Sequence, residues 1–282
     1  MFNIMKSREL LLARLRKEAG YLMADLSPWH RPVTPFVLVC RQRTGSNMLR
    51  YALETHPQVV HYGELFHPQR NAIFGAHGKY MYRPQSLLDW RRADARSFLN
   101  DVIYRDAAPP VRAVGFKLFY RHGRDDVAGN PWPVLAERRD IRVLHLVRSN
   151  PIASFLSHER MRNKNPHIQM RSGVRRTNGH LVQEAIVVDV EKLAAYLAEY
   201  DQEIRDFATE LAGHEIFELT YEALTTDPRV LEKVLAFLDV ERRTLHFQTV
   251  RQSEDDASKR IANRTEVNAV LRGTRWDSAA MP

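Results

Sequence analysis

The feature that most constrains the fold is a set of four short, β-rich apolar runs separated by helical patterns. The runs cover residues 36–40, 111–119, 143–147 and 215–219. A short continuous apolar run is typical of a strand that is buried on both faces. Strands that alternate with helices indicate parallel βαβ units. The sequence therefore predicts an α/β protein, with a three-layer α/β/α arrangement around a central, mostly parallel sheet.

The helical patterns between these runs cover residues 47–55, 151–161, 190–211 and 228–238. The third is long and amphipathic, and the fourth has Pro228 at its first turn, where proline is well tolerated. Two stretches show no such pattern: residues 68–90 are rich in Tyr, Gly and His, and residues 163–180 are rich in Arg and Asn. We expect both to be irregular insertions that contact a substrate.

The N-terminal segment has a composition of its own. Residues 1–26 interleave Lys and Arg with Leu, which predicts a basic amphipathic helix, and no signal peptide pattern is present. We expect a helical extension over residues 1–30, one domain over residues 31–282, and a cytoplasmic location. The helix is expected to pack against the domain or a second copy in a homodimer. Alternatively, it lies on an anionic inner membrane.

Composition points to an anionic partner without identifying it. The chain has 42 Lys and Arg against 34 Asp and Glu, a net charge of +8, and no apolar run long enough for a transmembrane helix. Eight of the 42 are Lys, so 34 are Arg, a residue that suits phosphate and sulfate, although coding bias would give the same count. A basic nucleic-acid-binding protein is one alternative. It is disfavoured, because the arginines are scattered along the chain and no nucleic-acid motif is present.

Metal and disulfide chemistry find little support in the sequence. The single cysteine, Cys40, excludes an internal disulfide and a cysteine-based metal cluster, and it lies in a run expected to be buried. His56, His61 and His67 lack the carboxylates and the spacing of a metal site. We therefore expect no metal cofactor.

The first candidate site is the turn that follows the run at residues 36–40. A strand that leads through a Gly-containing turn into a helix is a phosphate-binding geometry, because backbone N–H groups at the helix start point outward. Gly45 permits a tight turn, Arg43 supplies a positive fork, and three further residues add donors: Thr44, Ser46 and Asn47. The alternative is an ordinary helix start with a Ser or Asn cap. A nucleotide-dependent kinase is another alternative, but the fuller Gly-x-x-x-x-Gly-Lys-Ser/Thr pattern is absent.

The second candidate site follows the run at residues 143–147. Arg148 ends this strand, Pro151 opens the next helix, and Ser157 lies about two helical turns further on. Ligands of open parallel sheets bind beyond the carboxyl ends of the strands, where both candidate sites lie. Arg148 and Ser157 are therefore predicted to clamp one phosphate. The alternative is that Arg148 pairs with a surface carboxylate and that Ser157 has no function.

Taken together, the two sites resemble the PAPS-dependent sulfotransferase family, whose donor is 3′-phosphoadenosine 5′-phosphosulfate. Residues 37–49 are similar to the family's 5′-phosphosulfate loop, and residues 144–148 with Ser157 are similar to its 3′-phosphate motif. Residues 114–118 resemble a strand of bacterial carbohydrate sulfotransferases, and residues 219–224 resemble the late Tyr-Glu-x-Leu element. The resemblance extends from residue 37 to about residue 240. It implies the P-loop NTPase-like sulfotransferase fold, with PAPS as donor and PAP as product.

The departures from the family pattern indicate a branch. Arg43 stands where the eukaryotic cytosolic enzymes have Lys, and the spacing from Arg148 to Ser157 is one residue longer than in that branch. Both features fit the bacterial trehalose and nodulation-factor branches better, and residues 261–263 with Glu266 resemble the tail of the bacterial nodulation-factor and lipopolysaccharide type. The resemblance therefore implies a carbohydrate or glycolipid acceptor rather than a small phenol, and a reaction that needs no metal.

The reaction implied is an in-line transfer of a sulfonate to a hydroxyl, which requires a base and positive groups. Glu64 is the candidate base, because a Gly-Glu after the first βα unit supplies it in the similar bacterial enzymes. Its alternative is a helix cap or salt-bridge partner, and His61 and His67 are competing bases. Lys117 interrupts an apolar strand and is predicted to reach the sulfonate or a substrate oxygen, alongside Arg43. Its alternative is a lysine that extends to solvent.

Overall fold

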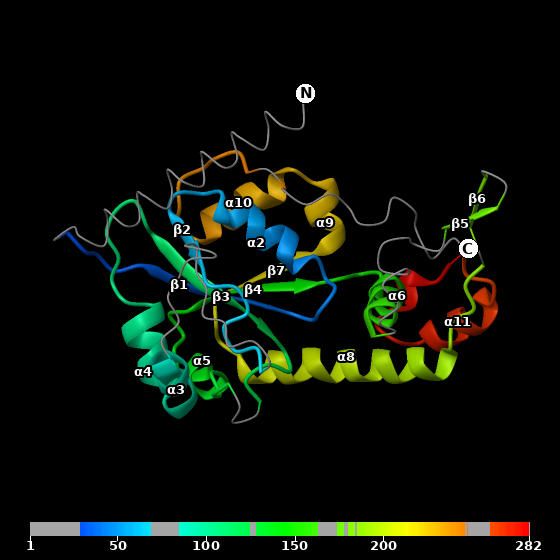
Figure 1. Cartoon of the computed structure of the whole chain (residues 1–282), viewed down its shortest axis with the longest axis horizontal. Coiled ribbons are helices and arrows are strands. Elements are labelled where there is room, and N and C mark those ends of the chain that lie inside the picture. The colour runs from blue at the N-terminus through cyan, green and yellow to red at the C-terminus, as the bar shows by residue number, and fades with distance from the viewer. Residues whose placement is uncertain are drawn as a thin grey trace.

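A five-stranded parallel sheet forms the centre of the molecule (Figure 1). The computed structural model describes residues 29–68, 85–124, 128–162, 174–177, 180–183, 185–245, 247 and 260–281. The strands lie in the order β2-β3-β1-β4-β7, and each neighbouring pair is parallel. Their bounds are β1 Thr34–Cys40, β2 Val59–His61, β3 Ala113–Phe119, β4 Arg142–Val147 and β7 Ile216–Thr220. Four of them are the predicted apolar runs; β2 was missed because it is only three residues long.

Successive residues of β1 alternate between two hydrophobic cores, one on each face of the sheet. Phe36 and Leu38 belong to the core beneath α2 (Ser46–Glu54) and α10 (Arg229–Phe237). Val37 and Val39 belong to the core beneath the long helix α8 (Val190–Glu210). This two-residue alternation is what a strand buried on both faces produces. It confirms the predicted α/β/α arrangement of layers.

The remaining helices complete the two outer layers (Figure 1). Short α9 (Tyr221–Thr226) lies with α2 and α10, while the other face carries, besides α8, the helices α3 (Gln85–Ala93), α4 (Ala95–Phe98) and α5 (Trp132–Glu137). A π-helical turn at Leu99–Ile103 continues α4. Near the N-terminal end of α8 lie α6 (Pro151–Arg162) and α11 (Arg264–Leu271), and a 3-10 turn follows α11 at Asp277–Ala279.

Both stretches predicted to be irregular contain regular structure. Within and just after residues 163–180 lie β5 (Val174–Thr177) and β6 (His180–Gln183), which form an antiparallel hairpin. Helix α3 occupies the end of the stretch at residues 68–90. Helix α3 was missed because most of its residues are polar or charged, so little hydrophobic periodicity is visible in its sequence. The basic segment at residues 1–26 lies outside the described residues. None of the described helices has the length and apolar character needed to span a membrane.

Candidate active site

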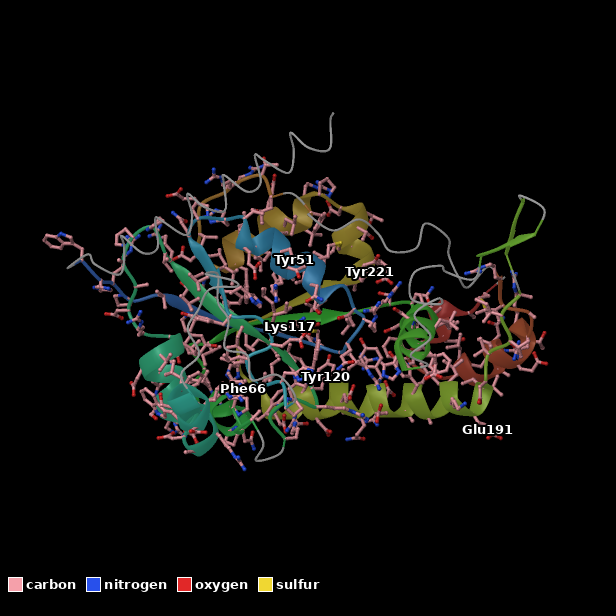
Figure 2. All side chains as sticks on the ribbon, viewed as in Figure 1. Tyr51, Phe66, Lys117, Tyr120, Glu191 and Tyr221 are labelled. Atoms are coloured by element: carbon pink, nitrogen blue, oxygen red, sulfur yellow. The ribbon has the colours of Figure 1, made fainter. Side chains whose placement is uncertain are left out.

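The carboxyl ends of the parallel strands meet along one edge of the sheet, and the predicted site residues lie there. The turn after β1 holds Arg43 and Gly45, the turn after β2 holds Glu64, and β4 leads directly into Arg148. Lys117 lies in β3, near the centre of the molecule (Figure 2). Because all these strands run in the same direction, residues far apart in sequence are brought together at this edge.

The turn after β1 has an unusual backbone conformation. Arg43 and Gly45 have φ angles of 68° and 84°, and such left-handed values are uncommon for a residue other than glycine. Gly45 is also confined sterically, since a Cβ atom there would lie 2.4 Å from the ring of Tyr221. Gly45 is the N-cap residue of α2, so no side chain caps this helix from that position. The alternative of a Ser or Asn cap is therefore not what the structure shows.

The polar side chains of this turn point in different directions. Thr44 is fully buried, and its hydroxyl donates to the carbonyl of Arg41 over 2.8 Å. Its hydroxyl is thus directed into the protein, which leaves the backbone N–H as its means of binding an anion. Ser46 is also buried, and its Oγ lies 3.5 Å from Nζ of Lys117. Asn47 is exposed, and its Oδ1 accepts a hydrogen bond of 2.7 Å from the same Nζ.

Lys117 links this turn to Glu64. Its side chain is 1% exposed, and its Nζ lies 2.9 Å from Oε1 of Glu64. The alternative of a lysine extending to solvent is therefore wrong. Burial lowers the pKa of Lys117, while the nearby carboxylate of Glu64 opposes that shift. The thiol of Cys40, at the end of β1, is buried as predicted, and burial raises its pKa to about 11.

Glu64 lies in the turn after β2, beside Lys117 and His67. Its side chain is 11% exposed, and His67 places Nε2 at 3.9 Å from Oε2. The ring of His67 in turn lies edge-on to that of His122, with 4.7 Å between the centroids. Glu64 is thus the partner of Lys117 in an ion pair, and it keeps a small exposed surface from which a carboxylate can accept a proton.

The two competing histidines differ in their surroundings. His61 is fully buried, and its Nδ1 accepts a hydrogen bond of 3.0 Å from the N–H of Gly63. Burial and the positive charges of Arg50 and Lys117 hold the pKa of His61 well below its ordinary value. A buried imidazole that is already bonded at Nδ1 is poorly placed to take a proton from a substrate. His67, whose side chain is 16% exposed, stays beside Glu64.

The structure joins the two predicted anion sites into one cluster. Nε of Arg43 donates to Oγ of Ser157 over 2.8 Å, although 114 residues separate them. Nη1 of Arg148 donates to the carbonyl of Arg43 over 3.2 Å. The two arginines and Ser157 therefore surround the same space at the end of β1 and β4.

Tyr221 and Glu222, for which the sequence predicts no role in the site, hold this cluster together. The ring of Tyr221 lies against Gly45 on one side, and the guanidinium of Arg148 lies 4.5 Å from its centroid. The carboxylate of Glu222 accepts hydrogen bonds from the N–H groups of Ser149 and Asn150, at 2.9 and 3.1 Å. The Tyr-Glu pair of the late element was the only sequence signal for these contacts, and it did not indicate a partner.

A cavity of about 340 Å³ opens beside the turn after β1. Aromatic side chains form part of its wall: Phe119, Tyr120, Phe155 and Tyr196. The rest is largely polar and comes from the turns after β1 and β3 and from α6 and α8: Arg41, Gln42, Arg121, His122, His158, Glu159, Lys192, Glu199 and Glu203. A volume of this size lies at the small end of the range for ligand sites.

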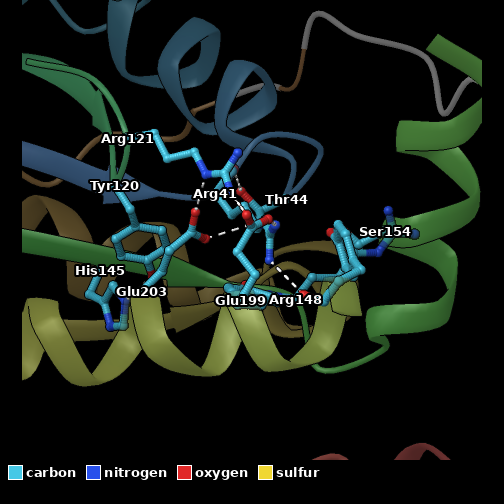
Figure 3. A network of polar contacts seen from close by, with 11 residues as sticks. Arg41, Thr44, Tyr120, Arg121, His145, Arg148, Ser154, Glu199 and Glu203 are labelled. Atoms are coloured by element: carbon cyan, nitrogen blue, oxygen red, sulfur yellow. Dashed lines mark hydrogen bonds and ion pairs between the residues drawn. The ribbon is translucent and has the colours of Figure 1, made fainter. Parts of the chain in front are cut away.

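Arg41 ties the first turn to α8 through a network in this cavity wall (Figure 3). Its guanidinium lies 4.0 Å from the ring centroid of Tyr196, forms ion pairs with Glu199 and Glu203, and donates to the carbonyl of Tyr196. Arg121 pairs with the same two carboxylates. Burial raises the pKa of Glu203. The charges on this part of the wall are therefore largely paired with one another.

Comparison with known proteins finds distant likenesses only among solved structures. No family model and no curated protein matches the chain. It is similar to a sulfotransferase from Alicyclobacillus acidocaldarius, with 17% identity and a TM-score of 0.42, over 85% of this chain and 90% of that one. It is also similar to the sulfotransferase domain from the curacin biosynthetic pathway, with 16% identity and a TM-score of 0.40, over 89% of this chain and 90% of that one. At this similarity neither match assigns an activity.

Proposed function

We propose that the chain is a PAPS-dependent sulfotransferase that transfers a sulfonate to a hydroxyl of a carbohydrate or glycolipid. The observation that carries this proposal is the convergence at one sheet edge of two groups. One is the cluster of Arg43, Arg148 and Ser157; the other is the ion pair of Lys117 with Glu64. The first suits a nucleotide with anionic groups at two positions. The second suits proton removal from a hydroxyl.

The donor would be held by the two turns together. The start of α2, whose N-cap residue has no side chain, offers outward N–H groups to the 5′-phosphosulfate. Arg43 adds a planar fork of donors on the same side. Arg148 and Ser157 lie next to it and would take the 3′-phosphate. Binding at two anionic positions would favour PAPS and PAP over nucleotides that lack the 3′-phosphate.

The transfer itself is a displacement at sulfur. The acceptor oxygen forms a bond to sulfur while the bond from sulfur to the phosphate oxygen breaks, and that electron pair leaves with PAP. Glu64 takes the proton of the acceptor hydroxyl. Lys117, fixed between Asn47 and Glu64, places a positive charge where negative charge develops on the transferred group.

The acceptor would enter through the cavity beside the first turn. Its aromatic side chains, which are largely buried, form an apolar part of the wall, and its charged groups offer donors and acceptors to the hydroxyls of a sugar. His122, which lines the cavity, leads through His67 toward Glu64. These contacts connect the wall of the cavity to the proposed base.

Two measurements test the proposal. In thermal-shift titrations, PAP should raise Tm and ATP should not; an ATP response without a PAP response would favour the kinase alternative. With labelled PAPS and candidate glycans, Glu64→Gln should lower turnover by about 100-fold or more while PAP affinity is kept. Glu232→Gln, on the outer helix α10, is the matched control and should transfer at the wild-type rate. Near-normal turnover in Glu64→Gln would show that another group is the base.

A further inference from the structure

His61 is the last residue of β2 and directly precedes the turn that carries Glu64. Its side chain is fully buried, with the ring of Phe36 5.9 Å away between centroids. It lies opposite Gly115 in the register with β3. Two residues later the chain turns at Gly63, whose φ of 62° directs Glu64 toward Lys117.

The backbone of this turn is fixed to β3 on two sides. The N–H of Tyr62 donates to the carbonyl of Gly115 over 2.8 Å, and the carbonyl of Gly63 accepts from the N–H of Lys117 over 2.7 Å. The N–H of Gly63 lies between these bonds in a buried position, where an unbonded donor would be costly. Nδ1 of His61 supplies its acceptor at 3.0 Å. The imidazole thus completes the set of bonds that holds the turn before Glu64.

This bond also fixes the chemical state of the imidazole. A ring nitrogen that accepts a hydrogen bond carries no proton, so the proton of neutral His61 is on Nε2. Within the described part of the chain, Nε2 has no hydrogen-bond partner. A buried donor without a partner lowers stability, and such a group calls for an explanation other than stability.

We propose that His61 is a positioning residue for Glu64: as a neutral acceptor for the N–H of Gly63, it holds the carboxylate of Glu64 against Lys117. This inference rests on the proposed function of Glu64 as the base. His61 acts through the backbone of the turn and touches neither donor nor acceptor.

The chain contains a matched control at the opposite end of β2. His56 is also buried, and its Nδ1 accepts a hydrogen bond of 3.1 Å from the N–H of Gln58, two residues later. Its Nε2 has a partner, the carbonyl of Glu241, at 3.0 Å. His56→Leu therefore removes an equivalent bond, from a backbone N–H two residues later to Nδ1, on the side of β2 away from Glu64. It also removes the bond between Nε2 and Glu241.

The experiment compares His61→Leu, His61→Asn and His56→Leu for Tm, PAP affinity, kcat and KM. Asparagine can accept an N–H two residues later through Oδ1, so His61→Asn restores the bond without an imidazole. His61→Leu should lower kcat by at least about tenfold with PAP affinity unchanged, because a small misplacement of a catalytic group is costly. His61→Asn should regain most of kcat, and His56→Leu should lower Tm without a comparable loss of kcat. Equal kcat losses in His61→Leu and His56→Leu, or no recovery in His61→Asn, would overturn the proposal.

A crystal structure of His61→Leu separates this inference from the proposed function. The distance from Oε1 of Glu64 to Nζ of Lys117 is 2.9 Å in the wild-type protein. It should lengthen beyond contact in His61→Leu and return in His61→Asn, whether or not the protein transfers sulfonate. An unchanged ion pair in His61→Leu would refute the positioning role. Absent transfer by the wild-type protein with an altered ion pair in His61→Leu would instead refute the role of Glu64 as base.

Discussion

The turns after β1 and β4 have similar sequences but different environments. Each leads from a buried strand through an arginine into a helix, α2 in the first case and α6 in the second. At the first turn, the N-cap residue of the helix is Gly45, which has no capping side chain. At the second, Glu222 accepts the N–H groups of Ser149 and Asn150, and Oδ1 of Asn150 accepts that of Ala153. The protein's own carboxylate thus occupies the second helix start.

This difference separates the roles of the two turns. A helix start binds an anion through N–H groups that have no other partner. The first turn can therefore bind an anion through its backbone, and it also contacts Lys117 through Asn47. The second turn can contribute mainly through the side chain of Arg148. We accordingly expect changes at the first turn and at its Lys117 contact to have the larger effects, on donor binding or on catalysis, and changes at the second turn to have smaller effects, on affinity but not on catalysis.

The largest effect is expected for Lys117→Met, which keeps an unbranched chain in the buried position but removes its charge. Glu64 loses its counter-charge and Asn47 loses its donor. We expect kcat to fall by about 100- to 1,000-fold, the usual cost of removing a group that stabilises transition-state charge. The rate of single-turnover transfer from labelled PAPS measures this fall in the catalytic step. PAP affinity serves as the control and should change little; a parallel loss of affinity and kcat would place Lys117 in donor binding instead.

Next comes Gly45→Ala, which tests the shape of the first turn. Alanine at φ 84° is strained, and its Cβ would collide with the ring of Tyr221 at 2.4 Å. We expect PAP affinity to fall by about tenfold or more, because the helix start and Arg43 both shift. Gly273→Ala is the control, since φ there is 69° but nothing lies within 4 Å of the added Cβ. Titration calorimetry should show a loss only at Gly45, and equal affinities would mean that the shape of this turn is unimportant.

Much of this arrangement was predictable from sequence, and the exceptions share a physical cause. The buried strands and the helices after them follow from local apolar patterns. Because the carboxyl ends of parallel strands meet at one edge of the sheet, the sequence also correctly places Arg43 near Arg148. The strand at Val59–His61 was missed, because three residues are too few to show a pattern. The contacts of Tyr221 and Glu222 connect segments more than 70 residues apart, and no local pattern encodes a partner at that separation.

A smaller effect is expected for Arg148→Ala, which tests the role of the second turn in affinity. Arg148 should bind the 3′-phosphate, so its loss should weaken PAP binding by about tenfold, as for one charge-assisted hydrogen bond. Adenosine 5′-phosphate lacks the 3′-phosphate and should bind the variant and the wild-type protein equally. Calorimetric titration with both nucleotides measures the difference. If both lose affinity to the same degree, Arg148 supports the turn rather than contacting the 3′-phosphate.

The smallest effect is expected for Glu222→Gln, which directly tests the difference between the environments of the two turns. An amide has one oxygen, so it can accept from Ser149 or Asn150 but meets the other N–H with its own donor group. Losing one such bond costs about 1 kcal/mol, which lowers Tm by a few degrees in a domain of this size. The turn then holds Arg148 less firmly, and PAP affinity should fall by about threefold, roughly 0.6 kcal/mol. Glu232→Gln, whose carboxylate pairs with Arg242 on the surface of α10, is the control for the loss of one charge. If Glu222→Gln and Glu232→Gln have the same Tm and the same PAP affinity, the carboxylate of Glu222 does not hold the start of α6. The environments of the two turns would then differ less than their hydrogen bonds indicate.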